Sequence, residues 1–404
     1  MSEQTNIPKH WQIKKLGDVC EIIMGQSPPS ATYNSQGIGL PFFQGKAEFT
    51  ELYPVVKKWC TTPNKIALPN DILLSVRAPV GATNVSNQKC CIGRGLAAIR
   101  YEGFKYVYYF LQSIEQLLDK KGTGTTFRAI SGETIRTTEI PIPPIPEQQA
   151  IVSKIEELLS DLENGKQQLQ TAQQQLKVYR QSLLKWAFDG RLTNKDVKDG
   201  ELPKGWKWVK VSEISNVVRG GSPRPAGDPK YYDGNIPFLK VSDITKDSNP
   251  YLTTFEYSIK EAGLHKTRLI KPNTLLLSNS GATLGIPKIA MIDATMNDGI
   301  AAFLDLDQRS NLYLYYFWLS KTKELRNINM GAAQPNLNTD IIKNYLVPYC
   351  SFSEQQCIVD ELESKLTICD KIEETISNSL KQAETLRQSI LKKAFEGKLI
   401  THSI

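Results

Sequence analysis

Side chains that can read the edges of base pairs occur in both halves of the chain, on segments that we expect to be loops. Arg and Lys donate hydrogen bonds to guanine or phosphate, and Gln and Asn pair with adenine, so these residue types suit contact with duplex DNA. Loops on a rigid scaffold are where binding residues usually lie. The candidate DNA contacts are Gln26, Gln44, Lys46, Arg77, Arg94, Arg128, Arg219, Arg224, Lys240, Asn279, Gln334 and Asn336.

Sequence motifs for covalent chemistry are absent. The chain has no Asn/Asp-Pro-Pro-Tyr/Phe tetrapeptide for methyl transfer to an amino group, no glycine-rich dinucleotide fingerprint and no P-loop for ATP hydrolysis. Glu361, Glu363 and Lys365 resemble a fragment of a nuclease triad, but their heptad context predicts the surface of a helix. We therefore predict no catalytic residues in this chain.

The chain contains an internal repeat. The motif Pro-Lys-x-Trp at 8–11 recurs at 203–206, and the segment 180–192 recurs closely at 387–399. A period near 200 residues is too long for a solenoid, so it indicates a tandem duplication of a domain plus an extension. Such a chain can present two similar surfaces related by a pseudo-twofold axis.

The polar side chains differ where the two copies should share one fold. Gln44 aligns with Lys240, and Arg94 aligns with Asp298. Arg77 aligns with Ser280, next to Asn279. This pattern is expected if two copies of one scaffold read two different sequences. Ordinary drift of surface side chains after duplication explains any single pair equally well, because such changes cost little stability.

Two long helices are predicted at matched positions, 147–192 and 354–404. Apolar residues alternate in steps of four and three, which is a heptad pattern, and Gly190 and Gly397 stand where a helix should end. The twofold relation predicts that the helices pair antiparallel as a coiled coil, and membership of a helical bundle is the alternative. The predicted seam contains Ile155, Leu162, Leu169, Leu176, Leu183, Leu362, Ile372, Ile376, Leu386 and Ile390.

The remaining segments predict two strand-rich bodies of mixed α/β (α+β) fold. Apolar runs such as 71–76 and 274–278 have the pattern of buried strands, and a helical pattern near 107–118 is repeated near 312–325. We expect an N-terminal domain at 1–146, a linker at 193–205 and a C-terminal domain at 206–353. The two long helices separate the domains.

The charge is unevenly distributed along the chain. The net charge of +7 divides into +5 for residues 1–146, 0 for 147–192, +4 for 193–353 and −2 for 354–404. The positive excess therefore lies in the two predicted domains, which indicates two bodies that face a polyanion.

Composition predicts a cytoplasmic globular protein without a metal site. Hydrophobic residues make up 40% of the chain, charged residues 23%, and the mean hydropathy is −0.32. The sequence has no secretory leader and no apolar run of membrane-spanning length, so no membrane partner is expected. Seven cysteines without C-x-x-C spacing and three histidines predict reduced thiols and no zinc site.

Taken together, these features resemble the specificity subunit of type I restriction-modification systems. The resemblance covers nearly the whole chain. It rests on the tandem halves, the Pro-Lys-x-Trp openings, the Pro-Phe pairs at 41–42 and 237–238, the Glu-Gln-Gln helix starts, and the Arg-Gln-Ser-(Leu/Ile)-Leu-Lys endings.

The resemblance implies that the chain recognises DNA and does no chemistry of its own. Each of two target recognition domains would read one half of a split, asymmetric site, and the paired helices would act as a spacer. Two modification subunits that use S-adenosylmethionine to methylate adenine would join the helices. Two restriction subunits that use ATP and Mg could also join, so this chain itself would bind no cofactor.

Two other functions compete with this hypothesis. One is a self-sufficient methyltransferase or nuclease, against which the missing motifs speak. The other is a stand-alone tandem DNA-binding scaffold without modification partners, in which the outer faces of the helices would be solvated and inert.

Overall fold

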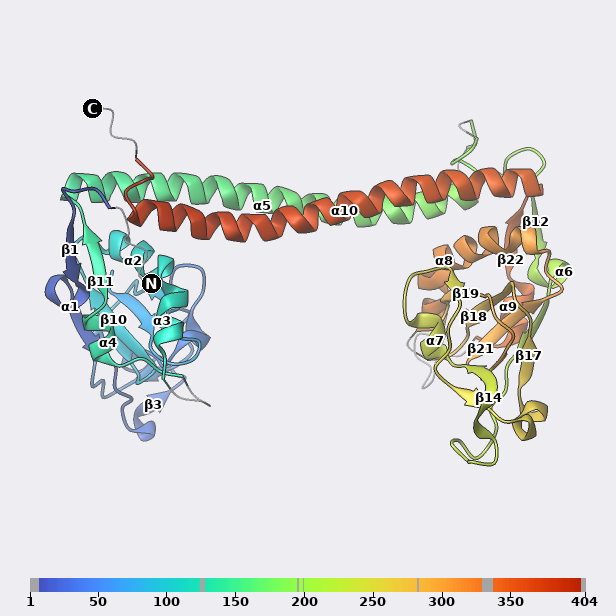
Figure 1. Ribbon diagram of the computed structural model, residues 1–404, viewed down its shortest axis with the longest axis horizontal. Coiled ribbons are helices and arrows are strands. Elements are labelled where there is room, and N and C mark those ends of the chain that lie inside the picture. The colour runs from blue at the N-terminus through green and yellow to red at the C-terminus, as the bar shows by residue number, and fades with distance from the viewer. Residues whose placement is uncertain are drawn as a thin grey trace. The chain divides into compact units, whose positions relative to one another are not determined.

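The protein divides into two compact units that each combine a body with parts of two long helices. Our computed structural model describes residues 7–123, 128–194, 196–198, 200–281, 283–328 and 337–400. Unit 1 comprises Met1–Gln170 with Ser377–Ile404, and unit 2 comprises Thr171–Ile376. The long helices are α5 (Ile145–Phe188) and α10 (Phe352–Phe395), so each unit contains part of both (Figure 1).

The body of unit 1 is built mainly from short strands. Its helices are α1 (Leu16–Val19), α2 (Phe104–Ser113), α3 (Glu115–Lys121) and α4 (Gly132–Arg136), with 3-10 turns η1 (Ser30–Thr32) and η2 (Lys46–Glu48). Its strands are β1 (Gln12–Lys15), β2 (Glu21–Met24), β3 (Tyr33–Asn34), β4 (Leu40–Phe43), β5 (Trp59–Cys60), β6 (Ile66–Ala67), β7 (Ile72–Ser75), β8 (Thr83–Val85), β9 (Cys90–Ile92), β10 (Leu96–Arg100) and β11 (Glu139–Ile142).

The body of unit 2 repeats this plan. Its helices are α6 (Val211–Ile214), α7 (Val241–Thr245), α8 (Asn311–Ile328) and α9 (Thr339–Asn344), with 3-10 turns η3 (Glu261–Lys266) and η4 (Gln308–Ser310). Its strands are β12 (Lys207–Lys210), β13 (Asn216–Arg219), β14 (Tyr232–Leu239), β15 (Tyr251–Leu252), β16 (Ser258–Ile259), β17 (Arg268–Ile270), β18 (Thr274–Ser278), β19 (Pro287–Ala290), β20 (Ala294–Met296), β21 (Ile300–Leu304) and β22 (Leu346–Tyr349).

The two bodies share the central strand order of their sheets. The order β2-β10-β7-β8 in unit 1 matches β13-β21-β18-β19 in unit 2, where β15 extends the edge. The parallel pair of β4 with β9 matches that of β14 with β20, and the ribbon β1-β11 matches β12-β22. The predicted mixed, strand-rich fold with an internal repeat is confirmed. β7 and β18 are buried along their whole length, as expected for apolar runs without alternation.

A phenylalanine at the C-terminal end of each long helix inserts into an aromatic cluster of a body. In unit 2 the ring of Phe188 lies 5.2 Å from that of Tyr313 and 5.4 Å from that of Phe317, edge to face. In unit 1 Phe395 makes the matching contacts with Tyr106 and Phe110, at 5.2 and 5.4 Å. Edge-to-face pairs contribute about 0.5–1.5 kcal/mol each beyond burial, so these rings fix the helices to the bodies.

Glycines end both long helices at equivalent positions. Gly190 and Gly397 have φ angles of 79° and 70°, in the left-handed region that other residues avoid. A Cβ atom at Gly190 would lie 2.2 Å from Pro203, and one at Gly397 would lie 2.4 Å from Pro8. The turn and the close proline contact explain why the helices end at 188 and 395, short of the predicted 192 and 404.

The long helices pack against each other within each unit. In unit 2 the guanidinium of Arg180 lies 2.6 Å from the carboxylate of Asp370 and 3.0 Å from that of Glu373. In unit 1 the N-terminal part of α5 shares a core with the C-terminal part of α10 through Ile151 and Leu391. In both units the end of one helix therefore meets the start of the other, which is antiparallel pairing.

The predicted seam is wrong at Ile372 and Leu386, which are 44% and 50% exposed. Ile372 and Leu386 each stand three positions after a buried residue of α10, Cys369 or Ala383. Their side chains point outward, because the bodies cover the other side of the helix. Of the remaining seam residues, Leu162 and Leu169 are half-buried. The buried ones are Ile155, Leu176, Leu183, Leu362, Ile376 and Ile390.

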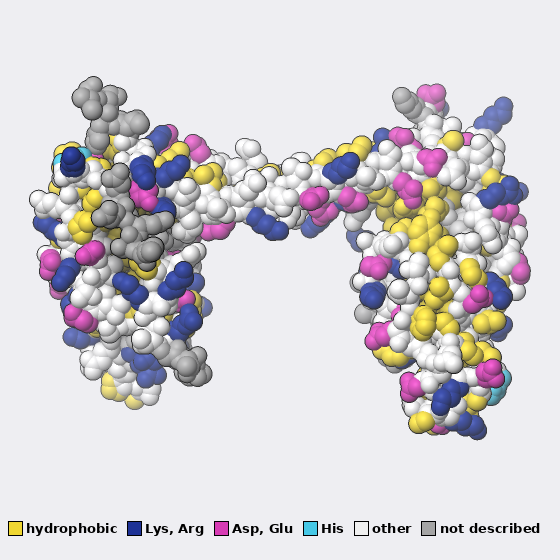
Figure 2. Space-filling view, in the orientation of Figure 1, with side chains coloured by type: hydrophobic (Ala, Val, Ile, Leu, Met, Phe, Trp, Pro, Cys, Tyr) yellow, Lys and Arg dark blue, Asp and Glu magenta, His cyan; other side chains and the backbone are white. Residues whose placement is uncertain are grey.

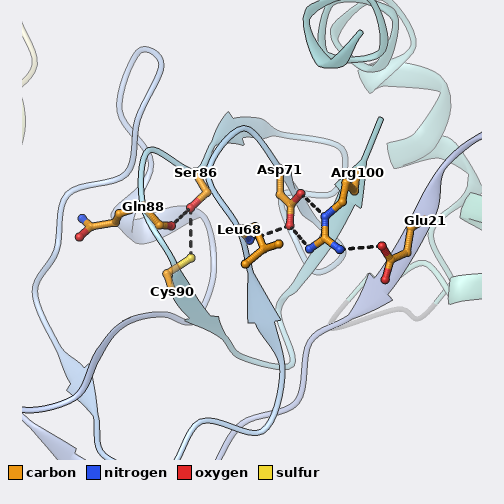
Figure 3. Close-up of polar contacts among 7 residues, drawn as sticks. All are labelled: Glu21, Leu68, Asp71, Ser86, Gln88, Cys90 and Arg100. Atoms are coloured by element: carbon orange, nitrogen blue, oxygen red, sulfur yellow. Dashed lines mark hydrogen bonds and ion pairs between the residues drawn. The ribbon is translucent and has the colours of Figure 1, made fainter. Parts of the chain in front are cut away.

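An ion pair inside unit 1 has no counterpart in unit 2. The buried carboxylate of Asp71 accepts hydrogen bonds from Nε and Nη2 of Arg100, both at 2.8 Å, and from the backbone N–H of Leu68 (Figure 3). Arg100 also donates to Glu21 at 2.6 Å. The strand registers align Asp71 and Arg100 with Thr274 and Leu304, which cannot form an ion pair.

The described part of the chain contains neither a membrane-spanning helix nor a cluster of metal ligands. No helix there is long and apolar enough to cross a membrane. Within the same ranges, no group of three or more His, Cys, Asp or Glu side chains is placed to hold a metal ion. All seven cysteines are free thiols, and only Cys357 is exposed.

Removing the buried carboxylate should destabilise unit 1. We expect Asp71→Ala to lower the free energy of unfolding by about 2–3 kcal/mol, because charge-assisted hydrogen bonds are lost in a buried site. The double variant Asp71→Thr with Arg100→Leu recreates the pair of unit 2 and should remain close to the natural protein. Urea unfolding measures the free energy of unfolding of both variants. Equal decreases in the single and the double variant would contradict this account.

Candidate nucleic-acid interface

The candidate residues of unit 1 converge where several strands end. Gln26 follows β2, Arg77 follows β7 and Arg94 precedes β10. The backbone N–H of Gly25 bonds the carbonyl of Leu96 at 2.9 Å, and that of Val76 bonds Gly95 at 2.9 Å. These bonds bring the three loops to one end of the four-stranded sheet.

Two more loops join this end of unit 1. Gln44 follows β4, and the N–H of Gly93 bonds the carbonyl of Phe43 at 2.8 Å. The N–H of Ala78 bonds the carbonyl of Arg128 at 3.0 Å. Gln44 and Lys46 line a shallow hollow with Ala78 and Pro79. The structure thus gathers six candidates on one surface with exposed side chains, the unit 1 cluster: Gln26, Gln44, Lys46, Arg77, Arg94 and Arg128.

The cations of the unit 1 cluster are not equally available. The guanidinium of Arg128 lies 3.3 Å from the carboxylate of Asp119 on α3. Arg94 is held through its backbone, since its N–H bonds the hydroxyl of Ser27 at 3.2 Å, and its side chain is exposed. Arg94 therefore has a fixed main chain and a side chain that can reach a ligand.

Unit 2 has the equivalent strand ends but different side chains. Arg219 ends β13, and the N–H of Gly220 bonds the carbonyl of Ile300 at 3.0 Å. Lys240 follows β14, whose last residue, Leu239, accepts a bond from the N–H of Asn297 at 2.9 Å. Arg219, Arg224, Lys240 and Asp298 form the unit 2 cluster.

Asp298 organises the unit 2 cluster. Its carboxylate accepts a hydrogen bond from the hydroxyl of Ser222 at 2.7 Å and lies 3.5 Å from the guanidinium of Arg224. Its backbone carbonyl accepts a bond from Nε of Arg219. The equivalent position in unit 1 is Arg94. Unit 1 therefore displays a guanidinium where unit 2 has a residue whose carboxylate pairs with Arg224 and whose backbone carbonyl bonds Arg219.

Lysines of unit 2 also lie over aromatic rings. Nζ of Lys240 is 3.2 Å from the ring centroid of Tyr257, and Nζ of Lys266 is 4.4 Å from that of Tyr231. A hydrogen bond from Lys266 lowers the pKa of Tyr231. In Figure 2, Lys and Arg side chains lie with a histidine and several Asp or Glu side chains at the end of unit 2 farthest from the long helices.

One of the predicted contacts does not join these surfaces, and two others have no described position. The prediction for Asn279 is wrong, because its side chain is fully buried. Its backbone continues the strand ladder by bonding Gly299 and Leu337, which turns the side chain inward, at the place that Val76 occupies in unit 1. Gln334 and Asn336 lie outside the described residues.

Sequence reasoning missed two residues of this surface. The sequence alignment of the two copies identifies Asp298 as the counterpart of Arg94 but does not predict it as a member of the site, although a carboxylate that replaces a cation between copies is a usable signal. Lys266 gave no signal, because its partner Tyr231 is distant in sequence and the pairing depends on the fold.

Comparisons with known proteins identify the family. The model of the type I restriction modification DNA specificity domain matches residues 8–171 and again 203–382. The chain belongs to this family. It is a DNA-sequence recognition subunit of the type I restriction-modification class, as the sequence predicted, and the stand-alone scaffold is not favoured.

Individual relatives agree with this assignment. The EcoBI specificity subunit of Escherichia coli is 27% identical over 420 residues, which cover 98% of this chain and 87% of that protein. A putative MjaX specificity subunit of Methanocaldococcus jannaschii is 43% identical over 163 residues, or 39% of this chain and 38% of that protein.

Solved structures share the fold. One comes from work on complex assembly and conformational transition of the type I R-M system, with a TM-score of 0.73 at 21% identity over 97% of this chain and 99% of that one. The HsdS subunit from Thermoanaerobacter tengcongensis has a TM-score of 0.63 at 20% identity over 97% and 98%.

Removing the charge of Asp298 should alter DNA binding in a specific way. We expect Asp298→Asn to raise affinity for unrelated duplexes by about two- to five-fold at low salt and to reduce discrimination, because Arg224 loses an ion pair and a negative charge disappears. Asp293→Asn is the matched control, since Asp293 pairs with Lys271 at 3.0 Å at the opposite end of β20. Fluorescence anisotropy at two salt concentrations measures this, and equal effects of both variants would contradict a role of Asp298.

Proposed function

We propose that the two units read the two halves of one split, asymmetric DNA site. This proposal rests on the position of the two clusters. They lie at equivalent strand ends of the two units but consist of different polar side chains. A shared scaffold gives both surfaces the same approach to a duplex, and the side chains set which base edges are bonded.

The two clusters offer different donors to the DNA. The unit 1 cluster presents Arg94 with Gln44, which suit guanine and adenine edges respectively. The unit 2 cluster presents Arg219 and Arg224 braced by Asp298, with Lys240 beside them. Because the donors stand at different positions on the same scaffold, we propose that the half-sites differ in sequence and that the whole site is asymmetric.

We propose that the rest of the enzyme comes from partners. Two modification subunits would dock on the long helices and use S-adenosylmethionine to methylate adenine, after flipping the base out of the duplex. Two restriction subunits that use ATP and Mg would join where restriction occurs. The long helices would set the gap between the half-sites, and the assembly would act in the cytoplasm.

The proposal is tested by giving the assembled complex a free choice of DNA. The chain is co-purified with the modification subunits encoded beside it and incubated with S-adenosylmethionine and a random duplex library. We expect methylated adenines in a two-part site with a fixed gap. Methylation at one continuous site, or without sequence preference, would contradict the proposal.

Truncating Arg94 should impair one half-site only. We expect Arg94→Ala to weaken binding of the target by about 10- to 100-fold, equivalent to about 1–3 kcal/mol for a lost bidentate contact, and to relax the sequence preference within one half. Lys89→Ala is the control, because Lys89 is exposed at the opposite end of β9. Methylation profiles of the library show the change, and relaxation in both halves would refute the assignment of separate surfaces.

Binding should depend steeply on salt. Each phosphate neutralised by Lys or Arg releases counterions, so the logarithm of the binding constant should fall linearly with the logarithm of the salt concentration. Removing one phosphate contact, for example with Lys46→Ala, should reduce the slope by about one while leaving the sequence preference intact. A salt-independent affinity would exclude the electrostatic part of the proposal.

A further inference from the structure

The paired long helices expose a row of apolar side chains in unit 2. Its members all project from α5 or α10 and are exposed to solvent in the structure; they are Val178, Tyr179, Trp186, Ile368 and Ile372, and we name them the outer row of unit 2. The rings of Tyr179 and Trp186 contact each other edge to face at 6.2 Å. Figure 2 shows that hydrophobic side chains interrupt the charged surface along the helices.

The outer row of unit 2 faces away from the body. The body packs on the helices through Phe188 on α5 and through Glu363 on α10, whose carboxylate accepts a bond from Tyr316 at 3.0 Å. At roughly 100° per residue, Trp186 lies about 200° from Phe188 around its helix, and Ile372 lies about 180° from Glu363. The row is therefore open on the side that α8 does not cover.

The equivalent positions in unit 1 are much less apolar. A shift of 207 residues aligns the outer row of unit 2 with Thr385, Leu386, Lys393, Asp161 and Gly165, the outer row of unit 1. Two aromatic rings are thus replaced by a leucine and a lysine, and two isoleucines by an aspartate and a glycine. Changes in the other direction include Lys365, which aligns with the half-buried Leu158, and Gln173, which aligns with the half-buried Leu380.

The spacing of the outer row of unit 2 suits a helical partner. Tyr179 and Trp186 are seven residues apart, and each stands three positions after a buried seam residue, Leu176 or Leu183. The row is thus continuous with the established seam between α5 and α10. Apolar side chains at heptad spacing beside such a seam form holes for the knobs of a further helix.

We infer that the two units bind the modification subunit with unequal strength, with unit 2 as the strong site. The occupant is an apolar-faced helical segment of that subunit, so this inference rests on the proposed recruitment. The physical reason is that aromatic anchors that become buried dominate interface energies, whereas Lys393 and Asp161 must lose water when they are covered. Assembly is therefore ordered: a complex with one modification subunit, held by unit 2, forms before the complex with two.

The test titrates the full-length chain with the modification subunit encoded beside it and counts bound copies by native mass spectrometry. We expect the first copy to bind about ten-fold or more tightly than the second, beyond the statistical factor for two equal sites. Trp186→Lys, which copies unit 1, should weaken the first step by about ten-fold and make the two steps alike. Lys393→Trp should instead tighten the second step.

Control measurements separate the possible failures. Ile368→Asp also copies unit 1 at an exposed position, so it replaces Trp186→Lys if thermal unfolding shows that variant to be misfolded. Equal steps in the natural chain, or an unchanged first step in both variants, would overturn the inference. If two copies bind equally and the library is methylated at a two-part site, the inference of unequal binding fails but the proposed function holds. If no copy binds, the inference and the proposed recruitment both fail.

Discussion

The insertion of one phenylalanine from each long helix into an aromatic cluster is the contact on which the rest of the structure depends. Phe188 and Phe395 are copies of one residue, and each meets a tyrosine and a phenylalanine of a body at the same distances. The cluster fixes how the helix pair lies on its body. It thereby decides which residues of α5 and α10 are buried and which, such as Trp186, remain open.

A shared backbone with different surface side chains explains how one scaffold carries two specificities. The backbone bonds that join the strand ends recur in both units, for example Val76 to Gly95 and Asn279 to Gly299. Side chains beyond those bonds carry little of the folding energy and can change freely. The exchange of Arg94 for Asp298 shows the result, because it moves the guanidinium groups to other positions without altering the strands. Even the buried ion pair of Asp71 and Arg100 is not required by the fold, because unit 2 has Thr274 and Leu304 at the equivalent positions.

Much of this could be predicted from sequence, because repeats and periodicity report on backbone and burial. The tandem halves, the strands at β7 and β18 and the glycine stops of the helices all followed from patterns. Side-chain direction did not. Asn279 is expected at the surface, but backbone hydrogen bonds to Gly299 and Leu337 just beyond the end of β18 turn its side chain inward. Ile372 fits an ideal heptad, yet it is exposed because a body covers only one flank of the helix pair.

The most direct test of the central claim is photo-crosslinking from one position in each cluster. A photoreactive amino acid is placed at Lys46 in one protein and at Lys240 in another, and each assembled complex is irradiated on DNA that contains the methylated site. The account predicts adducts in opposite halves of the site, and none from the same group placed at Lys271, at the far end of unit 2. Adducts in the same half from both positions would contradict the claim that the two units read separate half-sites.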